Sequence, residues 1–483
     1  MNGRRRLIVI ISSVCTLVLA FWINTTELAA IDKDQQEKNE SGLFDQLKVF
    51  TDVLAIVHRD YVREVPDKQL VEGAIKGLLS TLDPHSGYLD PEFYQDLQVQ
   101  TKGEFGGLGI EITIKDGLLI VVSPMEGSPA EKAGIKAGDT IVKIEGKYTK
   151  EYSLVDAVKK LRGPKGSAVD ISVFRKGRKD LIDVTLVRDN IQVKSVRSKY
   201  LNDGFGLVRI NQFMERTADD VKTALKSLSK SSPDAELKGI VLDLRNNPGG
   251  LLTQAIKVSD LFLKSGVIVY TDGRIEAQKQ KFFAHERDTE PDYPIVVIVN
   301  GGSASASEIV AGALKDHGRA VILGTQTFGK GSVQTITPLG NGGAITLTTA
   351  LYYTKSGKSL QGMGVKPDIE MVVRAPDEQQ EPAKESEPPP SSGNMMREAD
   401  LPGAIENPSG LEKKTPLQKI NKTGTERGDL STSNIELISL DDLLKKDLQL
   451  QRSLDLLKTF NIFGAPKPLE GETVKAQALP NAG

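Results

Sequence analysis

Cysteine is almost absent from this chain of 483 residues. The single example, Cys15, lies inside an apolar stretch near the N-terminus and lacks the setting of a lipidated cysteine, so we interpret it as an apolar filler. The rest of the chain has no thiol. Disulfides, thiolate zinc sites and cysteine nucleophiles are therefore excluded beyond that stretch.

Aromatic residues and net charge are also scarce. Phe, Trp and Tyr make up 5% of the chain, and the formal net charge is -2. Without a broad basic field, nothing in the composition points to nucleic acid as a partner. Glycine is abundant, with 45 residues, which suits a turn-rich chain with strands, and the length allows two or three domains with substantial cores.

The N-terminus has the features of an export signal. Three arginines, Arg4 to Arg6, precede an uncharged apolar run over residues 7–23, and Leu28-Ala29-Ala30 offers small residues for cleavage. The run is long for a signal peptide and short for a membrane span. We expect residues 1–30 to be a cleaved signal peptide or a retained anchor, which predicts a periplasmic protein at the inner-membrane surface.

Helical spacing dominates the next part of the chain, residues 43–100. Phe44, Leu47, Phe50 and Val53 recur at the period of one helix face. A second periodic run follows, and it ends at the breaker Asp83-Pro84-His85-Ser86-Gly87. We predict a helical packing module here.

Residues 104–189 change to a strand-rich pattern. Glycines 106, 107 and 109 lead into alternating isoleucines, strands are expected near 118–122, 140–144, 169–173 and 182–186, and a helix is expected over 154–161. A glycine-rich turn, a strand edge and a helix are the parts that capture the C-terminus of a peptide. The predicted peptide-binding residues are Gly107, Leu108, Gly109, Ile110 and Arg162.

Residues 200–375 alternate between strand and helix signals. The runs 239–244 and 295–299 are apolar enough for strands buried on both faces of a layered α/β core. Residues 376–435 contain Pro388-Pro389-Pro390 and many polar residues, which is typical of a disordered linker. Ser439 then begins an amphipathic helix over 439–461, which we interpret as a docking helix or an oligomer contact.

Ser305 is the first candidate for chemistry. It lies in Ser303-Ala304-Ser305-Ala306-Ser307-Glu308, between a buried strand and a helix-like segment, where sites in α/β folds gather. The N–H of Ala306 is placed to hold an oxyanion, and a helix N-terminus favours negative charge there. An ordinary helix-capping serine is the structural alternative.

Lys330 is the candidate base. His317 and Asp316 follow Ser305 on the same expected helix, roughly 16–18 Å away at about 1.5 Å per residue, too far to take its proton. Lys330 has glycines on both sides, and Gln334 follows in a strand-like run where its amide oxygen would hold the ammonium. An exposed lysine titrates near ~10.4, so a lowering by about 3 units, or roughly 4 kcal/mol of desolvation, would make it a base. A surface lysine in a turn is the alternative.

Two further glycine motifs bear on the site. Asp243-Leu244-Arg245-Asn246-Asn247-Pro248-Gly249-Gly250 ends the other buried strand, and Gly250 or Gly249 would supply a second oxyanion donor. Residues 324–330 match a phosphate-binding loop as far as the lysine. Gly331 replaces the required Ser or Thr and a strand-like run follows in place of a helix, so we reject a nucleotide site.

Taken together, these motifs resemble those of the C-terminal processing peptidases, or tail-specific proteases, over about residues 43–372. The resemblance implies an α+β multidomain fold: a helical N-terminal module, a PDZ domain and a ClpP/crotonase-like α/β protease core split around that PDZ domain. It implies that Ser305 is the nucleophile, Lys330 the base and Gln334 the residue that orients the lysine. An aspartate matching Asp316 belongs to the family's catalytic set, but the distance along the helix makes us expect a structural role.

The resulting prediction is an exported serine endopeptidase that binds exposed C-terminal tails and cleaves them, without a cofactor or metal. It would process or degrade cell-envelope proteins. An adaptor protein and homo-oligomerisation through the N- and C-terminal helices are left open as partners. The competing interpretations are a catalytically silent PDZ scaffold of the periplasm and a crotonase-type acyl-CoA enzyme.

Overall fold

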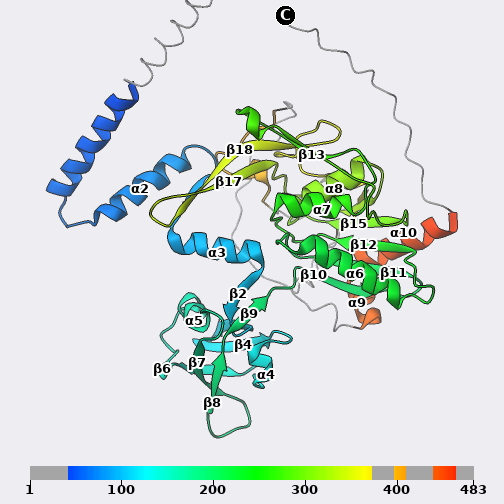
Figure 1. Ribbon diagram of the computed structural model, residues 1–483, viewed down its shortest axis with the longest axis horizontal. Coiled ribbons are helices and arrows are strands. Elements are labelled where there is room, and N and C mark those ends of the chain that lie inside the picture. Colours follow the sequence, from blue (N-terminus) through cyan, green and yellow to red (C-terminus); the bar gives the residue numbers. More distant parts are fainter. Residues whose placement is uncertain (1–41, 373–395, 409–438, 464–483) are drawn as a thin grey trace, which may run out of the picture. The chain divides into compact units, whose positions relative to one another are not determined.

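The computed structural model describes residues 42–372, 396–408 and 439–463 (Figure 1). The described chain divides into two compact units, with the boundary between Leu78 and Leu79. The predicted signal or anchor, residues 1–30, lies outside the described residues, as does most of the predicted linker. In the described ranges, every helix is too short or too polar to span a bilayer.

The first unit contains the two predicted N-terminal helices. One covers residues 42–60, and the second is α2 (Asp67–Ser80). Their helical nature confirms the periodic pattern of the sequence. The apolar face of the first helix, however, is exposed: Phe44 retains 69% and Val53 52% of its accessible surface.

The breaker motif does not belong to this helical module. The strand β1 (Gly87–Leu89) pairs antiparallel with β18 (Ala344–Thr354), so the chain enters the second unit before it forms α3 (Pro91–Lys102). Asp90 caps α3 by accepting from the N–H groups of Glu92 and Phe93. The predicted boundary at residue 100 is therefore displaced, because β-pairing across the sequence outweighs the local pattern.

A small β domain follows as predicted. Its sheet has the order β3-β4-β5-β7-β8, with β6 paired to β5, and a separate ribbon joins β2 to β9. The strands are β2 (Glu104–Gly107), β3 (Ile110–Lys115), β4 (Leu118–Pro124), β5 (Thr140–Ile144), β6 (Lys147–Tyr148), β7 (Ala168–Phe174), β8 (Ile182–Val187) and β9 (Asp189–Gln192). Its helices are α4 (Pro129–Lys132) and α5 (Leu154–Leu161), and α5 starts at a capping box formed by Ser153 and Asp156.

The core sheet has the order β10-β11-β12-β15-β16-β19, and all neighbours except β10 and β11 run parallel. Both predicted apolar strands are present and buried along their whole length. The strands are β10 (Val196–Tyr200), β11 (Phe205–Ile210), β12 (Gly239–Asp243), β15 (Ile295–Val299), β16 (Val321–Gly324) and β19 (Ile369–Glu370).

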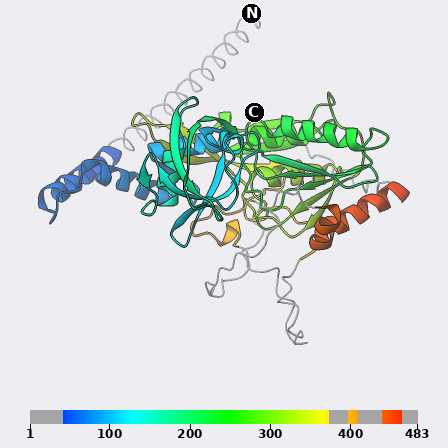
Figure 2. The ribbon, with the colours of Figure 1, turned by 90° about the horizontal axis from the view of Figure 1, so that it is seen from below.

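Helices cover this sheet on both faces (Figures 1 and 2). Residues such as Leu242 and Val297 pack in one cluster with α6 (Thr217–Ser231), α7 (Leu252–Asp260) and α8 (Ala306–Asp316). The alternate residues pack against α9 (Leu440–Lys446) and α10 (Leu448–Phe463), which bury Leu443, Leu450, Leu454 and Leu457. The predicted C-terminal helix is thus two helices, separated at Asp447, and it docks on the core.

A second sheet completes the core. It has the order β1-β18-β13-β14, with β17 also paired to β18. The remaining strands are β13 (Val267–Gly273), β14 (Gln280–Phe283) and β17 (Ser332–Pro338), with a short 3-10 turn η1 (Glu276–Gln278) between β13 and β14. Lys330 lies in the loop between β16 and β17, so that loop joins the two sheets.

Part of the predicted disordered linker is folded. Residues 396–408, which we call the strap, contain the 3-10 turn η3 (Glu398–Asp400), and Glu398 has only 1% of its surface exposed. The composition of this segment is polar, but Glu398 finds buried partners, and this offsets its desolvation. The linker prediction is therefore wrong for the strap, while residues 376–395 and 409–435 lie outside the described residues.

Candidate active site

Ser305 lies where β15 delivers the chain to α8. It is the N-cap residue of that helix and has φ 53°, a left-handed conformation that is unusual for a residue with a side chain. Such strain costs about 1–3 kcal/mol and collects at functional sites, including the serine turn of many hydrolases. The serine is partly exposed, whereas Ser303 and Ser307 are fully buried and bond to backbone carbonyls.

Glu308 joins the serine turn to the lysine loop. One of its carboxylate oxygens, Oε2, accepts from the backbone N–H of Ser305 at 2.8 Å and from that of Lys330 at 2.9 Å. The other, Oε1, accepts from the N–H of Gly329 and the hydroxyl of Thr327. The side chain is completely buried, and burial raises its pKa to about 7. The four hydrogen bonds act in the opposite direction, because they stabilise the ionised form. A single carboxylate thus fixes both candidate catalytic residues.

Lys330 itself is partly buried. Burial lowers the pKa of Lys330, whereas the carboxylates of Glu398, Asp83 and Glu308 act in the opposite direction. The direction of the net shift is the one a general base requires. Among the described residues, no hydrogen bond joins its ammonium to the hydroxyl of Ser305 or to the amide of Gln334, and such bonds are often long before substrate binds.

Gln334 has the predicted position in β17. Its amide Nε2 donates to the Ser332 hydroxyl at 2.9 Å and to the Thr348 hydroxyl at 3.4 Å. Those bonds fix the direction of the amide group, which leaves its oxygen for another donor. Its role in orienting Lys330 stays a prediction.

Asp83 is a site residue that the sequence did not reveal. It is buried and accepts from the hydroxyls of Ser86 and Thr348 and from the N–H groups of His85 and Ser86. Although burial acts against ionisation, these bonds hold the pKa of Asp83 below its usual range. The pairing of β1 with β18 carries this carboxylate to the lysine. The breaker motif was the available signal: it ends a helix and is part of the family resemblance, but neither observation gave Asp83 a role at the site.

The three predicted oxyanion donors differ in whether their N–H groups are available for a substrate. A Cβ added to Gly249 would lie 2.8 Å from the Cβ of Ser305 and 3.0 Å from the nitrogen of Ala306, so the two loops touch. The N–H of Gly249 is already bonded to the Asn247 side chain at 2.9 Å, and it is therefore not a donor for substrate. The N–H groups of Ala306 and Gly250 have no acceptor among the described residues. They remain the predicted pair.

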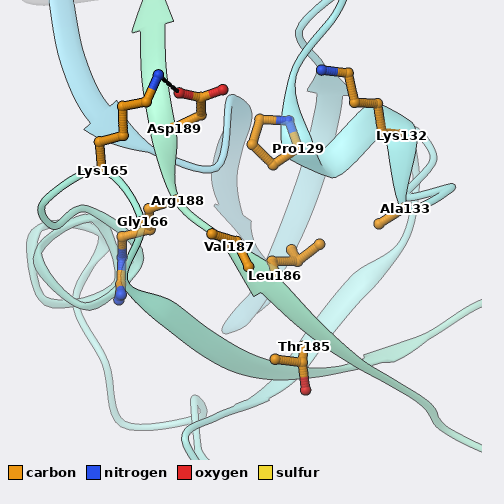
Figure 3. Close-up of a pocket in the computed structure, with 10 residues that line it drawn as sticks. All are labelled: Pro129, Lys132, Ala133, Lys165, Gly166, Thr185, Leu186, Val187, Arg188 and Asp189. Atoms are coloured by element: carbon orange, nitrogen blue, oxygen red, sulfur yellow. Dashed lines mark ion pairs between the residues drawn. The ribbon is translucent and has the colours of Figure 1, made fainter.

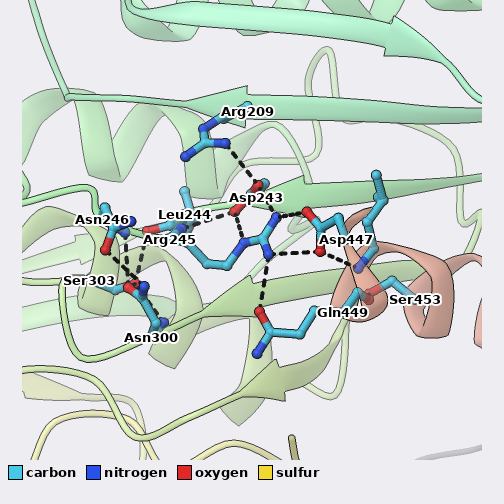
Figure 4. Close-up of polar contacts among 11 residues, drawn as sticks. Arg209, Asp243, Leu244, Arg245, Asn246, Asn300, Ser303, Asp447, Gln449 and Ser453 are labelled. Carbon is cyan, nitrogen blue, oxygen red and sulfur yellow. Dashed lines mark hydrogen bonds and ion pairs between the residues drawn. The ribbon is translucent and has the colours of Figure 1, made fainter. Parts of the chain in front are cut away.

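An ionic network anchors the loop that carries Gly250 (Figure 4). Arg245 donates to both carboxylate oxygens of Asp243 and, across the sheet, to those of Asp447, between α9 and α10. Burial works against both charges, but Arg245 holds the pKa of Asp243 below its usual range, and the aspartates raise that of Arg245. The C-terminal helices are thus tied to the loop.

Asp316 ends α8, and the helix between it and Ser305 is continuous. Its carboxylate accepts from the N–H of Ser356 at 3.0 Å, in the turn after β18. His317 bonds to the carbonyl of Val267. Both contacts are structural and agree with the expectation that neither residue is a direct partner of Ser305.

Four of the predicted peptide-binding residues run from the end of β2 to the start of β3, and Arg162 follows α5. Neither Leu108 nor Gly109 donates its N–H to another described residue, as a carboxylate-binding turn requires. Arg162 is engaged elsewhere: it pairs with Asp96 of α3 at 2.9 Å and stacks on Phe105. Its role in peptide binding stays a prediction.

A pocket of about 500 Å³ lies on the other edge of the small domain (Figure 3). It is lined by α4, the turn at Lys165 and the β8 edge, and Lys165 pairs with Asp189 at 2.7 Å beside it. None of the predicted peptide-binding residues lines it. Over the described ranges, no cluster of His, Asp or Glu side chains suits a metal ion.

Comparison with known proteins agrees with this geometry. Residues 204–371 match the model of peptidase family S41, residues 120–175 match a PDZ domain, and residues 9–93 match the N-terminal domain of the activating protease CtpB. A carboxy-terminal-processing protease of Bartonella bacilliformis is 51% identical over 338 residues, which are 70% of this chain and 77% of that protein. The chain belongs to the carboxy-terminal processing proteases.

Other relatives extend the match. The carboxy-terminal processing protease CtpA of Bacillus subtilis is 33% identical over 93% of this chain and 97% of its own length. Among solved structures, a photosystem II D1 C-terminal processing protease is 32% identical, covers 66% of this chain and 86% of its own chain, and has a TM-score of 0.40. The protein is therefore a serine-type peptidase with a PDZ domain, which is consistent with binding of peptide C-termini.

Proposed function

We propose that this protein is an exported serine endopeptidase that uses Ser305 and Lys330 as a catalytic dyad on tails selected by its PDZ domain. The observation that carries the proposal is the shared carboxylate oxygen of Glu308, which binds the backbone of both residues. Burial also lowers the pKa of Lys330, which is the direction that favours the neutral amine a general base requires.

In this mechanism, neutral Lys330 takes the proton as Ser305 attacks the scissile carbonyl. The N–H groups of Ala306 and Gly250 hold the oxyanion, next to the N-terminus of α8. The lysine ammonium then protonates the leaving amine, and water hydrolyses the acyl-enzyme. Gln334 holds the lysine between the two proton transfers.

The first test is the pair Ser305→Ala and Lys330→Ala. Each variant should lose at least about a thousandfold in kcat/KM because nucleophile and base act as a unit. Thermal unfolding should stay near that of the parent, since Ser305 is partly exposed and strained. Near-normal turnover of Lys330→Ala would contradict the dyad, and a serine-reactive probe that labels Ser305 would separate a protease from an acyl-CoA enzyme.

The second test concerns tail recognition. A peptide with a free C-terminal carboxylate should be cleaved with a KM about tenfold lower than its amide, because the turn at Leu108 and Gly109 offers N–H groups to an anion. Equal KM values for acid and amide would contradict tail recognition. Localisation to the periplasm and action on cell-envelope proteins are part of the same proposal, and trapping substrates with Ser305→Ala in cells tests them.

A further inference from the structure

The strap contacts the lysine loop directly, although it lies beyond the protease-family match, which ends at residue 371. The backbone N–H of Glu398 donates to the carbonyl of Phe328 at 3.1 Å, two residues before Lys330. This bond adds to those that the loop makes with Glu308 and with the neighbouring segments at Ser303 and Gly362. The strap therefore holds the loop on the side that precedes the lysine.

A second connection holds the other side of the lysine. Gln361 is fully buried, and its Oε1 accepts from the N–H of Gly331 at 3.0 Å. Its Nε2 donates to Glu398 Oε1 at 2.9 Å and to the carbonyl of Ile405 at 3.2 Å, while Asn407 donates to its carbonyl. Through Gln361, the strap fixes the residue that follows Lys330.

The carboxylate of Glu398 is also paired with His85. The Nε2 atom of His85 lies 2.8 Å and 2.9 Å from the two carboxylate oxygens. The His85 backbone N–H in turn donates to Asp83. Glu398 thereby connects the strap, the breaker motif and the loop in one buried network, with 1% of its side chain exposed.

Three carboxylates favour the charged form of Lys330, each from a different element. Glu398 comes from the strap, Asp83 from the segment before β1 and Glu308 from α8; among these, Glu398 opposes the effect of burial on the Lys330 pKa most strongly. A negative charge at Glu398 favours the ammonium over the amine. Its removal would therefore extend the active range of a lysine base to lower pH.

We propose that the strap is an intramolecular clamp of the lysine loop, and that Glu398 is a positioning residue that fixes Lys330 and sets the pH range in which it serves as the base. This rests on the proposed function, because it assumes that Lys330 is the base. A carboxylate at this place stabilises the ammonium that Lys330 forms when it takes the proton of Ser305. For the same reason, Lys330 becomes neutral only at higher pH than it would without Glu398.

The experiment measures kcat and KM of the full chain against pH on an unstructured fluorogenic peptide with a free C-terminus. Glu398→Gln keeps an amide oxygen for Gln361, removes the charge and replaces the oxygen that faces only His85 with an NH2 group. The acid limb of its kcat/KM profile should move to lower pH by about 0.5–1 unit relative to the parent enzyme. Its plateau kcat should stay within about threefold of the parent value. Glu398→Ala also removes the connection, and its plateau kcat should fall about tenfold or more at a KM within about twofold.

Asp400→Asn is the matched control, because Asp400 lies on the same strap and only accepts from the N–H of Arg397. It should follow the parent enzyme in both measurements. The proposal would be overturned by any of three results. The acid limb of kcat/KM stays in place in Glu398→Gln, the plateau kcat is unchanged in Glu398→Ala, or Asp400→Asn shifts the acid limb as much as Glu398→Gln does. If Glu398→Ala does not fold, the pH profile of the isosteric Glu398→Gln decides.

The failure of this proposal is distinguishable from failure of the proposed function. An inactive parent enzyme, or an active Lys330→Ala, would contradict the dyad itself. An active parent, an inactive Lys330→Ala and Glu398 variants that behave like the parent would contradict the strap alone.

Discussion

Two buried glutamates hold the same loop, and they come from very different regions. Glu308 belongs to α8 inside the protease domain, and its acceptors bind only backbone N–H groups and one hydroxyl. Glu398 belongs to the strap and is bound by side chains, those of His85 and Gln361. The inner support fixes the backbone of the site, whereas the outer support fixes its surroundings and its charge.

The loop that carries Gly250, which we call the oxyanion loop, also has one support from inside the protease domain and one from outside it. Inside the protease domain, Asn300 accepts from the Asn246 N–H and donates to its side chain. From outside, Asp447 binds Arg245 on the strand side of the same loop (Figure 4). Loss of an inner support should therefore cost more activity than loss of an outer one, and three variants or conditions test that ranking.

The largest effect is expected for Glu308→Gln. An amide group would direct N–H donors at the N–H groups that the carboxylate now accepts, and the backbone of Ser305 and Lys330 would separate. We expect kcat to fall about 10²–10³-fold, or about 2.7–4 kcal/mol in activation free energy, as for loss of a preorganised site contact. A loss smaller than that of Glu398→Ala would reverse the ranking of the two supports.

The second effect concerns stability against pH. Because burial raises the pKa of Glu308 to about 7 from an ordinary 4.5, the native state binds its proton more tightly than the unfolded state does. The contribution of Glu308 to the free energy of unfolding is therefore fully present below pH 4.5 and is lost as pH rises to about 7. The loss over that window amounts to about 3 kcal/mol.

Urea unfolding of the parent and of Glu308→Gln at both ends of the window measures this contribution. The difference in unfolding free energy between the two proteins should shift in favour of Glu308→Gln as pH rises, while all other titrating groups cancel. Parallel pH curves for the two proteins would show that Glu308 titrates normally.

The smallest effect is expected for Asp447→Asn. The amide keeps one acceptor for Arg245, and Asp243 still pairs with the guanidinium, so the charge is not left alone. We expect a loss of about 1–2 kcal/mol in the free energy of unfolding and less than about tenfold in kcat. Asp442→Asn, at the start of α9, is a control for charge removal on the same helices. A drop in kcat as large as that of Glu308→Gln would mean that the outer support governs the oxyanion loop.

The inner support could be predicted in part from sequence, and the outer one could not. Ser305 and Glu308 stand three residues apart in a capping pattern, next to an apolar strand, and these are local signals. Glu398 lies in a polar segment whose composition indicates disorder, and its partners Gln361 and His85 are distant in sequence. Only β1 pairing with β18 brings His85 to the site.

For the fold as well, features with a local sequence signal could be predicted, and contacts between distant segments could not. The strands over 239–243 and 295–299, the helix over 154–161 and the capped start at Ser439 were evident from periodicity and capping residues. The sequence pattern did not predict that Asp83 would approach Lys330, nor that Gly249 would use its N–H internally, since both depend on the meeting of separate loops. Local patterns define elements, while contacts between elements define the site.

The position of α10 at the end of the described chain has a consequence for synthesis. The sheet face that includes Leu207, Val241 and Val296 is covered by leucines of α9 and α10, which the ribosome makes after the strands of that sheet. Domains fold as units while the chain emerges, at about 5–20 residues per second. The nascent chain therefore carries an uncovered apolar sheet face and an unanchored Arg245 until α9 and α10 have emerged.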